Sequence, residues 1–221
     1  MGEAIGQILG LAVGVAISPV PIIALILMLF STSAASNSLS FLVGWLAGLT
    51  GVSIVVLAIG IEGSDGDADS GGVVKILIGV VFLLLAVKQW RSRPVPGEEP
   101  SMPAWMASVD SFTPLKAFGL AVLLSAVNPK NLGLTIAAAA TIGSVGLDTG
   151  EEAVVVAVYV ILASITLIVP VLGFLAARER MTPVLDSMKS WLMANNATVM
   201  AVLFAVLGAK VLGDGISTVS G

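Results

Sequence analysis

The sequence predicts an all-α protein that crosses a membrane several times. Of its 221 residues, 57% are hydrophobic and only 11% are charged, whereas a soluble domain carries about 25% charged residues. The apolar stretches are continuous rather than alternating, which is typical of membrane-spanning helices and not of strands. The composition therefore indicates a multi-pass helical protein of a cell membrane (the inner or plasma membrane).

Six stretches are long enough to span a bilayer, because about 20 helical residues cross about 30 Å of hydrocarbon. Met1–Phe30 is interpreted as the first span and not as a cleavable signal peptide, since its only early charge is Glu3 and its apolar run is too long for a signal sequence. The six predicted spans are Ile5–Phe30, Leu39–Ile61, Val73–Gln89, Leu115–Gly143, Ala153–Ala177 and Trp191–Leu212. The segments between them, including Arg178–Lys189, are predicted to be polar connections.

Charged residues between the spans predict the orientation of the chain. Basic residues favour the cytoplasmic side. They flank the third and fifth connections, whereas the second and fourth connections are acidic, so both termini are predicted outside. The basic residues are Lys88, Arg91, Arg93, Lys116, Arg178, Arg180 and Lys189; the acidic ones of the fourth connection are Asp148, Glu151 and Glu152; and Lys75 and Lys210 lie near the opposite face.

In this orientation the first and fourth spans run in opposite directions, which predicts two inverted repeats of three spans each. The predicted repeats are residues 1–90 and 115–221, joined by a proline-rich cytoplasmic linker at 91–114. A sequence match supports the repeat: "AISPVPIIAL" (Ala16–Leu25) aligns with "AVNPKNLGLT" (Ala126–Thr135). In both stretches a small polar residue precedes a proline near the centre of a span.

These prolines predict that the first and fourth spans are each broken into two half-helices. Proline inside a helix removes a hydrogen bond and clashes with the preceding turn. Ser or Asn followed by Pro is also the pairing that starts a helix, as N-cap and first helical residue. The new half-helices are expected to begin at Ser18-Pro19 and at Asn128-Pro129, with Pro21 and Asn131 extending the irregular regions.

Lys130 is the charged residue at the second break, and none of the six predicted spans contains Asp or Glu to pair with it. Both new helix N-termini carry partial positive charge, so the site is expected to attract anions. An unpaired ammonium at the bilayer centre costs at least about 2.5–3.5 kcal/mol. Lys130 is therefore expected to face a hydrated cavity, to be neutral part of the time, or to meet an anion from outside the protein.

A structural interpretation of the same residues stays open. Lys130 could donate to carbonyls that the prolines expose, or could reach an interface, and Ser18 and Asn128 could serve as helix caps instead of direct ligands. Ser164 and Thr166 could likewise line a cavity or bond to their own helix.

The remaining features predict packing or exclude functions. Small residues recur at Gly6, Gly10 and Gly14 and at Gly44, Gly48 and Gly51, which indicates close helix packing.

"DGDAD" (Asp65–Asp69) lacks the later glycine and glutamate of an EF-hand. With no histidine, no cysteine and no catalytic or phosphate-binding motif, we expect no enzyme activity, no metal site, no cofactor and no nucleic-acid partner. "PAWMASVDSF" (Pro103–Phe112) is expected to form a short interfacial helix.

Several of these stretches together resemble the lysine-exporter (LysE) superfamily, and most closely its GAP branch of sulfolipid- or peptidoglycolipid-addressing proteins. The stretches are "ISPVPIIALILML" (Ile17–Leu29), "FLVGWLAGL" (Phe41–Leu49), "PAWMASVDSFTPLKA" (Pro103–Ala117) and "LSAVNPKNLGL" (Leu124–Leu134). The resemblance implies a transporter-like membrane protein that moves lipids or glycolipids toward the cell envelope. It also implies that the central residues are Ser18, Pro19, Pro21, Asn128, Pro129, Lys130 and Asn131. The absence of cysteine excludes the superfamily's thiol electron carriers.

The predicted function is therefore a secondary exporter that moves an anionic or zwitterionic lipid or glycolipid, with membrane lipids as its partners. Two alternatives stay open: export of a small solute such as an amino acid, and a non-transporting assembly factor for a lipid export machine. Whether the chain forms a homo-oligomer also stays open.

Overall fold

A computed structural model describes residues 1–60, 68–93 and 104–220, and every regular element in these ranges is a helix. By its contacts the chain divides into two compact units: Met1–Gly63 with Met102–Ser190, and Ser64–Ser101 with Trp191–Gly221. The first unit contains both predicted helix breaks and is the one that matters for the candidate site. The helices are α1 (Gly2–Ala16), α2 (Pro19–Phe30), α3 (Ala34–Ile59), α4 (Ala68–Arg91), η1 (Ala104–Ser111), α5 (Pro114–Val122), η2 (Leu123–Val127), α6 (Pro129–Ser144), α7 (Thr149–Ala176) and α8 (Arg178–Ser220).

The prediction of several membrane-crossing helices is confirmed. Among the described residues, α3, α7 and α8 are each long and apolar enough to cross a membrane. Two further crossings are made if each of two bent helix pairs counts as one span. The helix α4 covers the predicted third span, Val73–Gln89, but is not among the helices that qualify. The structure thus supports three to five spans.

Both predicted helix breaks are present. At the first break the chain bends by 55° between α1 and α2. At the second break it bends by 62° between the α5–η2 segment and α6. In each pair the second half-helix starts at the predicted proline, Pro19 or Pro129. The local chemistry of proline is therefore sufficient to explain where these helices stop and restart.

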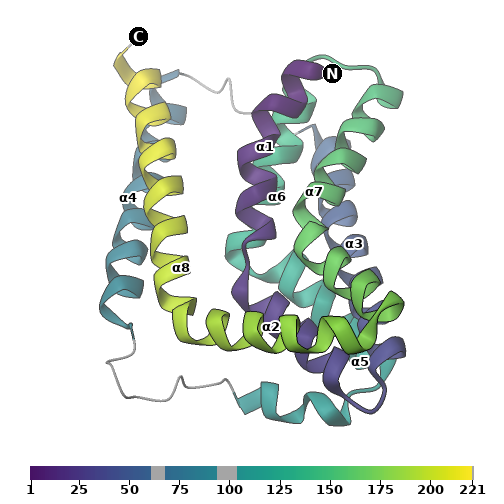
Figure 1. The fold of residues 1–221 in the computed structure, drawn as a ribbon. Coiled ribbons are helices and arrows are strands. Elements are labelled where there is room, and N and C mark those ends of the chain that lie inside the picture. Colours follow the sequence, from purple (N-terminus) through teal and green to yellow (C-terminus); the bar gives the residue numbers. More distant parts are fainter. Residues whose placement is uncertain (61–67, 94–103, 221) are drawn as a thin grey trace. The chain divides into compact units, whose positions relative to one another are not determined.

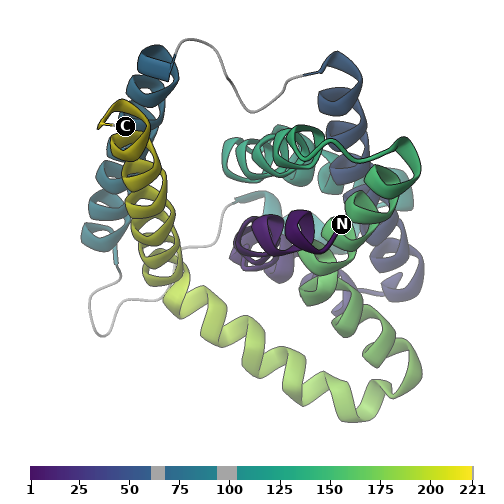
Figure 2. The same ribbon diagram turned by 90° about the horizontal axis from the view of Figure 1, so that it is seen from above.

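The first unit is built around contacts between broken and continuous helices. The continuous helix α3 packs along α5, and the continuous helix α7 packs along α1, while α6 packs against α1 and α3. Figures 1 and 2 show α1, α3, α6 and α7 gathered together in both views. Because α6 begins where α1 ends and then packs along it, the two half-helices run antiparallel.

Glycine spacing predicts close packing correctly at Gly44 and Gly48 but not at Gly51, Gly6 or Gly10, while Gly14 is buried in α1. A Cβ atom added to Gly44 would overlap the carbonyl of Phe118, and one added to Gly48 would overlap the Ser125 hydroxyl. By contrast, a Cβ atom at Gly6 or Gly10 would meet nothing within 4 Å. Spacing defines a helix face, but it does not tell whether another helix lies opposite.

In the second unit, α4 and the later part of α8 cross closely. A Cβ atom at Gly79 would lie 2.7 Å from the Leu212 backbone nitrogen, and one at Gly208 would lie 3.0 Å from the Gly79 carbonyl. The rings of Phe82 and Phe204 pack with their centroids 5.7 Å apart. Small residues in these two helices thus allow the backbones to approach.

The predicted polar connection Arg178–Lys189 is helical and forms the start of α8. Arg, Glu, Met and Lys are good helix formers, and Lys189 pairs with Asp186 at 2.8 Å one turn earlier. The segment is polar because it need not cross a membrane, and polarity does not prevent it from being helical.

The predicted short helix before the fourth span is present as the 3₁₀ helix η1, which turns Met106 and Val109 inward and packs on α2. Most of the acidic stretch Asp65–Asp69 and the central part of the 91–114 linker lie outside the described residues.

Candidate substrate site at the two helix breaks

The first break leaves backbone carbonyls without helical partners, and side chains from other helices supply donors to them. In a continuous helix the Ile17 carbonyl would accept from residue 21, but Pro21 has no N–H. Instead, Lys130 Nζ donates to the Ile17 carbonyl at 3.1 Å. Thr166 Oγ1 donates to the Ala16 carbonyl at 2.7 Å. The break is thus stabilised by α6 and α7.

The second break has a different local structure. The fourth span continues past α5 through a π-helical turn, in which the Asn128 N–H donates to the Leu123 carbonyl at 2.9 Å. The Asn128 side-chain oxygen then accepts from the Lys130 N–H at 3.1 Å, which caps α6. The prediction that Asn128 serves as a helix cap is confirmed. The Ser18 side chain, in contrast, makes no capping hydrogen bond to α2.

The two breaks meet through a buried cluster of three side chains. Lys130 Nζ donates to Ser18 Oγ at 2.6 Å. The Ser18 hydroxyl in turn donates to Asn131 Oδ1 at 3.0 Å. Asn131 Nδ2 donates to the Leu124 carbonyl at 2.8 Å. Ser18, Lys130 and Asn131 are 4%, 7% and 1% exposed. Residues more than 110 positions apart in the chain therefore form one polar centre.

The prolines of the predicted site shape the backbone around this centre. Pro19 and Pro21 are buried in the first turn of α2, whereas Pro129 is exposed at the start of α6. Proline has no N–H to donate. Of the seven predicted residues, Ser18, Lys130 and Asn131 thus form the polar core, and Asn128 and the three prolines define where the half-helices begin.

The cluster continues toward α7 through two residues that the sequence did not single out. Thr135 Oγ1 donates to the Asn131 carbonyl at 2.7 Å. The Tyr159 hydroxyl donates to Thr135 Oγ1 at 3.0 Å. Both residues are fully buried. Two signals could have indicated them: Thr135 lies four residues after Asn131 on the same helix face, and Tyr159 is the chain's single tyrosine.

The open question about Ser164 and Thr166 is resolved differently for each residue. Ser164 Oγ donates to the Val160 carbonyl of its own helix at 2.6 Å. Thr166 instead donates to Ala16 of the other half of the chain. Thr166 is therefore a contact residue of the first break that the sequence left undecided.

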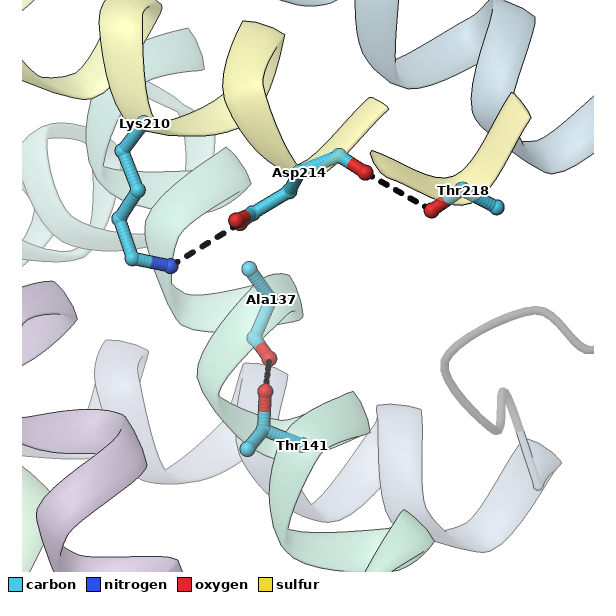
Figure 3. Close-up of polar contacts among 5 residues, drawn as sticks. All are labelled: Ala137, Thr141, Lys210, Asp214 and Thr218. Carbon is cyan, nitrogen blue, oxygen red and sulfur yellow. Dashed lines mark hydrogen bonds and ion pairs between the residues drawn. The ribbon is translucent and has the colours of Figure 1, made fainter. Parts of the chain in front are cut away.

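Lys130 has no acidic partner in the part of the chain that the structure describes. There the ion pairs join Lys189 to Asp186 at 2.8 Å and Lys210 to Asp214 at 3.1 Å; Figure 3 shows the second of these pairs on α8. The Lys130 ammonium lies instead at the C-terminal end of α1, where the helix dipole is negative. Two of its three N–H groups donate to uncharged acceptors, the Ile17 carbonyl and the Ser18 hydroxyl. The centre therefore lacks a fixed counter-ion among the described residues.

Comparison with known proteins gives one match. The family described as "Sap, sulfolipid-1-addressing protein" matches residues 8–217. The chain belongs to this family. No curated protein and no solved structure matches it. The family agrees with the resemblance to the GAP branch stated above, and the match extends over both helix breaks and the residues of the buried cluster.

Proposed function

We propose that the protein is a membrane transporter that moves an anionic or zwitterionic amphiphile, such as a glycolipid, toward the cell envelope. The observation that carries this proposal is the buried Lys130 ammonium, which joins two helix breaks and has no acidic partner among the described residues. Intramembrane cations of this kind mark substrate or ion pathways. Membership of a sulfolipid-addressing family makes a lipid the first substrate class to test.

The proposed architecture is six spans in two inverted repeats, with α4 as the third span. Two pairs of contacts support the repeat. In the proposed repeats α3 is equivalent to α7, and α5 is equivalent to α1. The packing of α3 on α5 in one place therefore corresponds to the packing of α7 on α1 in the other. In each half the continuous helix also touches the break of the other half, through Gly48 against Ser125 and through Thr166 against Ala16. Such repeats, with substrate sites at interrupted helices near the midplane, are found in many secondary transporters.

The proposed mechanism uses Lys130 as a link that an anion can release. Without substrate, Nζ holds α6 to the α1–α2 break through Ile17 and Ser18. An anionic head group competes for the same donors, because a charge-assisted hydrogen bond is about twice as strong as a neutral one. Binding would therefore loosen the contact between the two halves and let them rock against each other.

A lipid-translocation assay tests the proposal. The protein is reconstituted into vesicles that contain a fluorescent phosphatidylglycerol or phosphatidylethanolamine, and the rate at which the probe changes leaflet is measured by quenching. Lys130→Met should reduce the rate about tenfold or more, since loss of a hydrogen bond to a charged group costs about 1.5–3 kcal/mol. Lys116→Met removes an exposed lysine near the start of α5 and serves as the control. A wild-type rate equal to that of empty vesicles for both probes, or equal rates for Lys130→Met and wild type, would refute the proposal.

A further inference from the structure

An apolar groove runs along the first unit between α3 and α7. Its volume is about 670 Å³. The lining side chains are mostly apolar, with Thr50, Thr149 and Glu152 as the polar exceptions. None of these residues belongs to the cluster around Lys130, so the groove is a separate feature of the fold.

Small side chains on one wall create the groove. Ala153 and Ala157 lie four residues apart on α7, which places them on the same helix face. Helix α6 approaches α3 closely at the lining residue Leu57, because a Cβ atom at Gly143 would lie 3.3 Å from Leu57 Cδ2. Ala139 and Ala140 of α6 pack with Val56 of α3 in the same region. Helix α6 therefore packs against the α3 wall of the groove.

The length of the groove matches one leaflet of a bilayer. On α3 it extends from Leu46 to Ala58, and on α7 from Thr149 to Ile161. At 1.5 Å per residue, twelve residues of helix cover about 18 Å. Half of a bilayer's hydrocarbon core is about 15 Å thick. A groove of this length within two membrane-crossing helices can accommodate one extended acyl chain along its whole length.

The two ends of the groove differ in chemistry. Thr149 and Glu152 lie at one end, in the first turn of α7, and Glu152 has no ion-pair partner in the described ranges. A free carboxylate and a hydroxyl at this end complement a head group that carries ammonium or hydroxyl donors, and repel a head group that is only anionic.

The other end of the groove reaches the level of the helix breaks. Val160, which lines this end, follows Tyr159, whose hydroxyl belongs to the buried cluster. On α3 the lining residues Leu46 and Thr50 flank Gly48, which packs on Ser125 just before the second break. The groove therefore connects the head-group level of one leaflet with the depth of the proposed substrate site.

We propose that this groove binds one acyl chain of a bilayer lipid whose donor-bearing head group lies at the Thr149–Glu152 end. The groove holds the lipid tail in one leaflet while the polar head group travels by way of the broken helices. This role rests on the proposed transport function, but occupancy of the groove can be measured without any transport.

Photocrosslinking in lipid nanodiscs tests the inference on the full-length protein. The probes are phosphatidylethanolamine and phosphatidic acid, each with a diazirine in one acyl chain, and labelled positions are found by mass spectrometry. Label from phosphatidylethanolamine should concentrate on the α3 and α7 residues that line the groove. Ala157→Phe, which fills the groove, should reduce this labelling about fivefold, because a chain cannot share the volume with the ring. Val154→Phe is the matched control, since Val154 is 51% exposed on the same helix and does not line the groove.

Two results would overturn the inference. Label spread evenly over the exposed side chains of both helices, Val154 included, would show ordinary boundary lipid only. Equal groove labelling by both probes, unchanged in Glu152→Gln, would refute the assigned head-group end. Translocation measured in the same preparations separates this failure from failure of the proposed function: an empty groove with Lys130-dependent transport would refute the groove alone, and a specific groove without transport would refute the transporter.

Discussion

Thr166→Val tests whether side chains from another helix stabilise the first break. The substitution keeps the shape of the side chain and removes the hydroxyl that donates to the Ala16 carbonyl at 2.7 Å. Ala16 is 6% exposed, so water has little access to the carbonyl that loses its donor. Hydrogen bonds between membrane helices average about 0.6 kcal/mol, and a buried acceptor left without a partner costs about 1–3 kcal/mol. We therefore expect a loss of about 1 kcal/mol in the free energy of unfolding.

The control for this prediction lies two residues away on the same helix. Ser164→Ala removes a hydroxyl that is fully buried but donates only to the Val160 carbonyl of its own helix. Its expected cost is below about 0.5 kcal/mol, because that carbonyl keeps its backbone partner. Both variants are unfolded by titration with sodium dodecyl sulfate in mixed micelles, with helicity as the readout. Equal losses for the two variants would contradict the contact between Thr166 and the break.

Three further variants test other parts of the structure. Gly48→Leu should destabilise the protein by about 1–3 kcal/mol through overlap with Ser125. Gly51→Leu should change stability little, because a Cβ atom there meets nothing within 4 Å. Similar losses for the two variants in the same titration would refute the packing of α3. Tyr159→Phe should cost about 0.6 kcal/mol, since the hydroxyl bond to Thr135 is the polar contact it removes; an unchanged unfolding free energy would contradict that bond.

The positions of the helix breaks were predictable from sequence because their cause is local. Proline removes a backbone donor wherever it stands, so Pro19 and Pro129 define the start of each half-helix without knowledge of the surroundings. The capping role of Asn128 follows from the same local chemistry. Donation by Lys130 to a carbonyl that the prolines free was one of the interpretations that the sequence left open, and the structure identifies the acceptor as Ile17.

Contacts between helices were not predictable in the same way. Ser164 and Thr166 have similar hydroxyls two residues apart, yet only Thr166 reaches another helix, because the two side chains point to different sides of α7. Gly6 and Gly48 both belong to regularly spaced glycines, but of these two only Gly48 packs against a neighbouring helix. Tyr159 was missed because one phenol hydroxyl in an apolar span forms no periodic pattern, and its being the chain's single tyrosine was the remaining signal.

The most direct measurement is the proximity of Ser18 and Asn131, whose side chains join the two breaks. The chain has no cysteine, so Ser18→Cys with Asn131→Cys gives the only thiol pair in the membrane-embedded protein, and Hg²⁺ can bridge it. Ser18→Cys with Gly133→Cys is the control, because Gly133 lies exposed on α6 with nothing within 4 Å of its added Cβ atom. We expect rapid bridging of the first pair and none of the second. Failure of the first pair to bridge, or equal bridging of both pairs, would mean that the two broken helices do not meet at this centre.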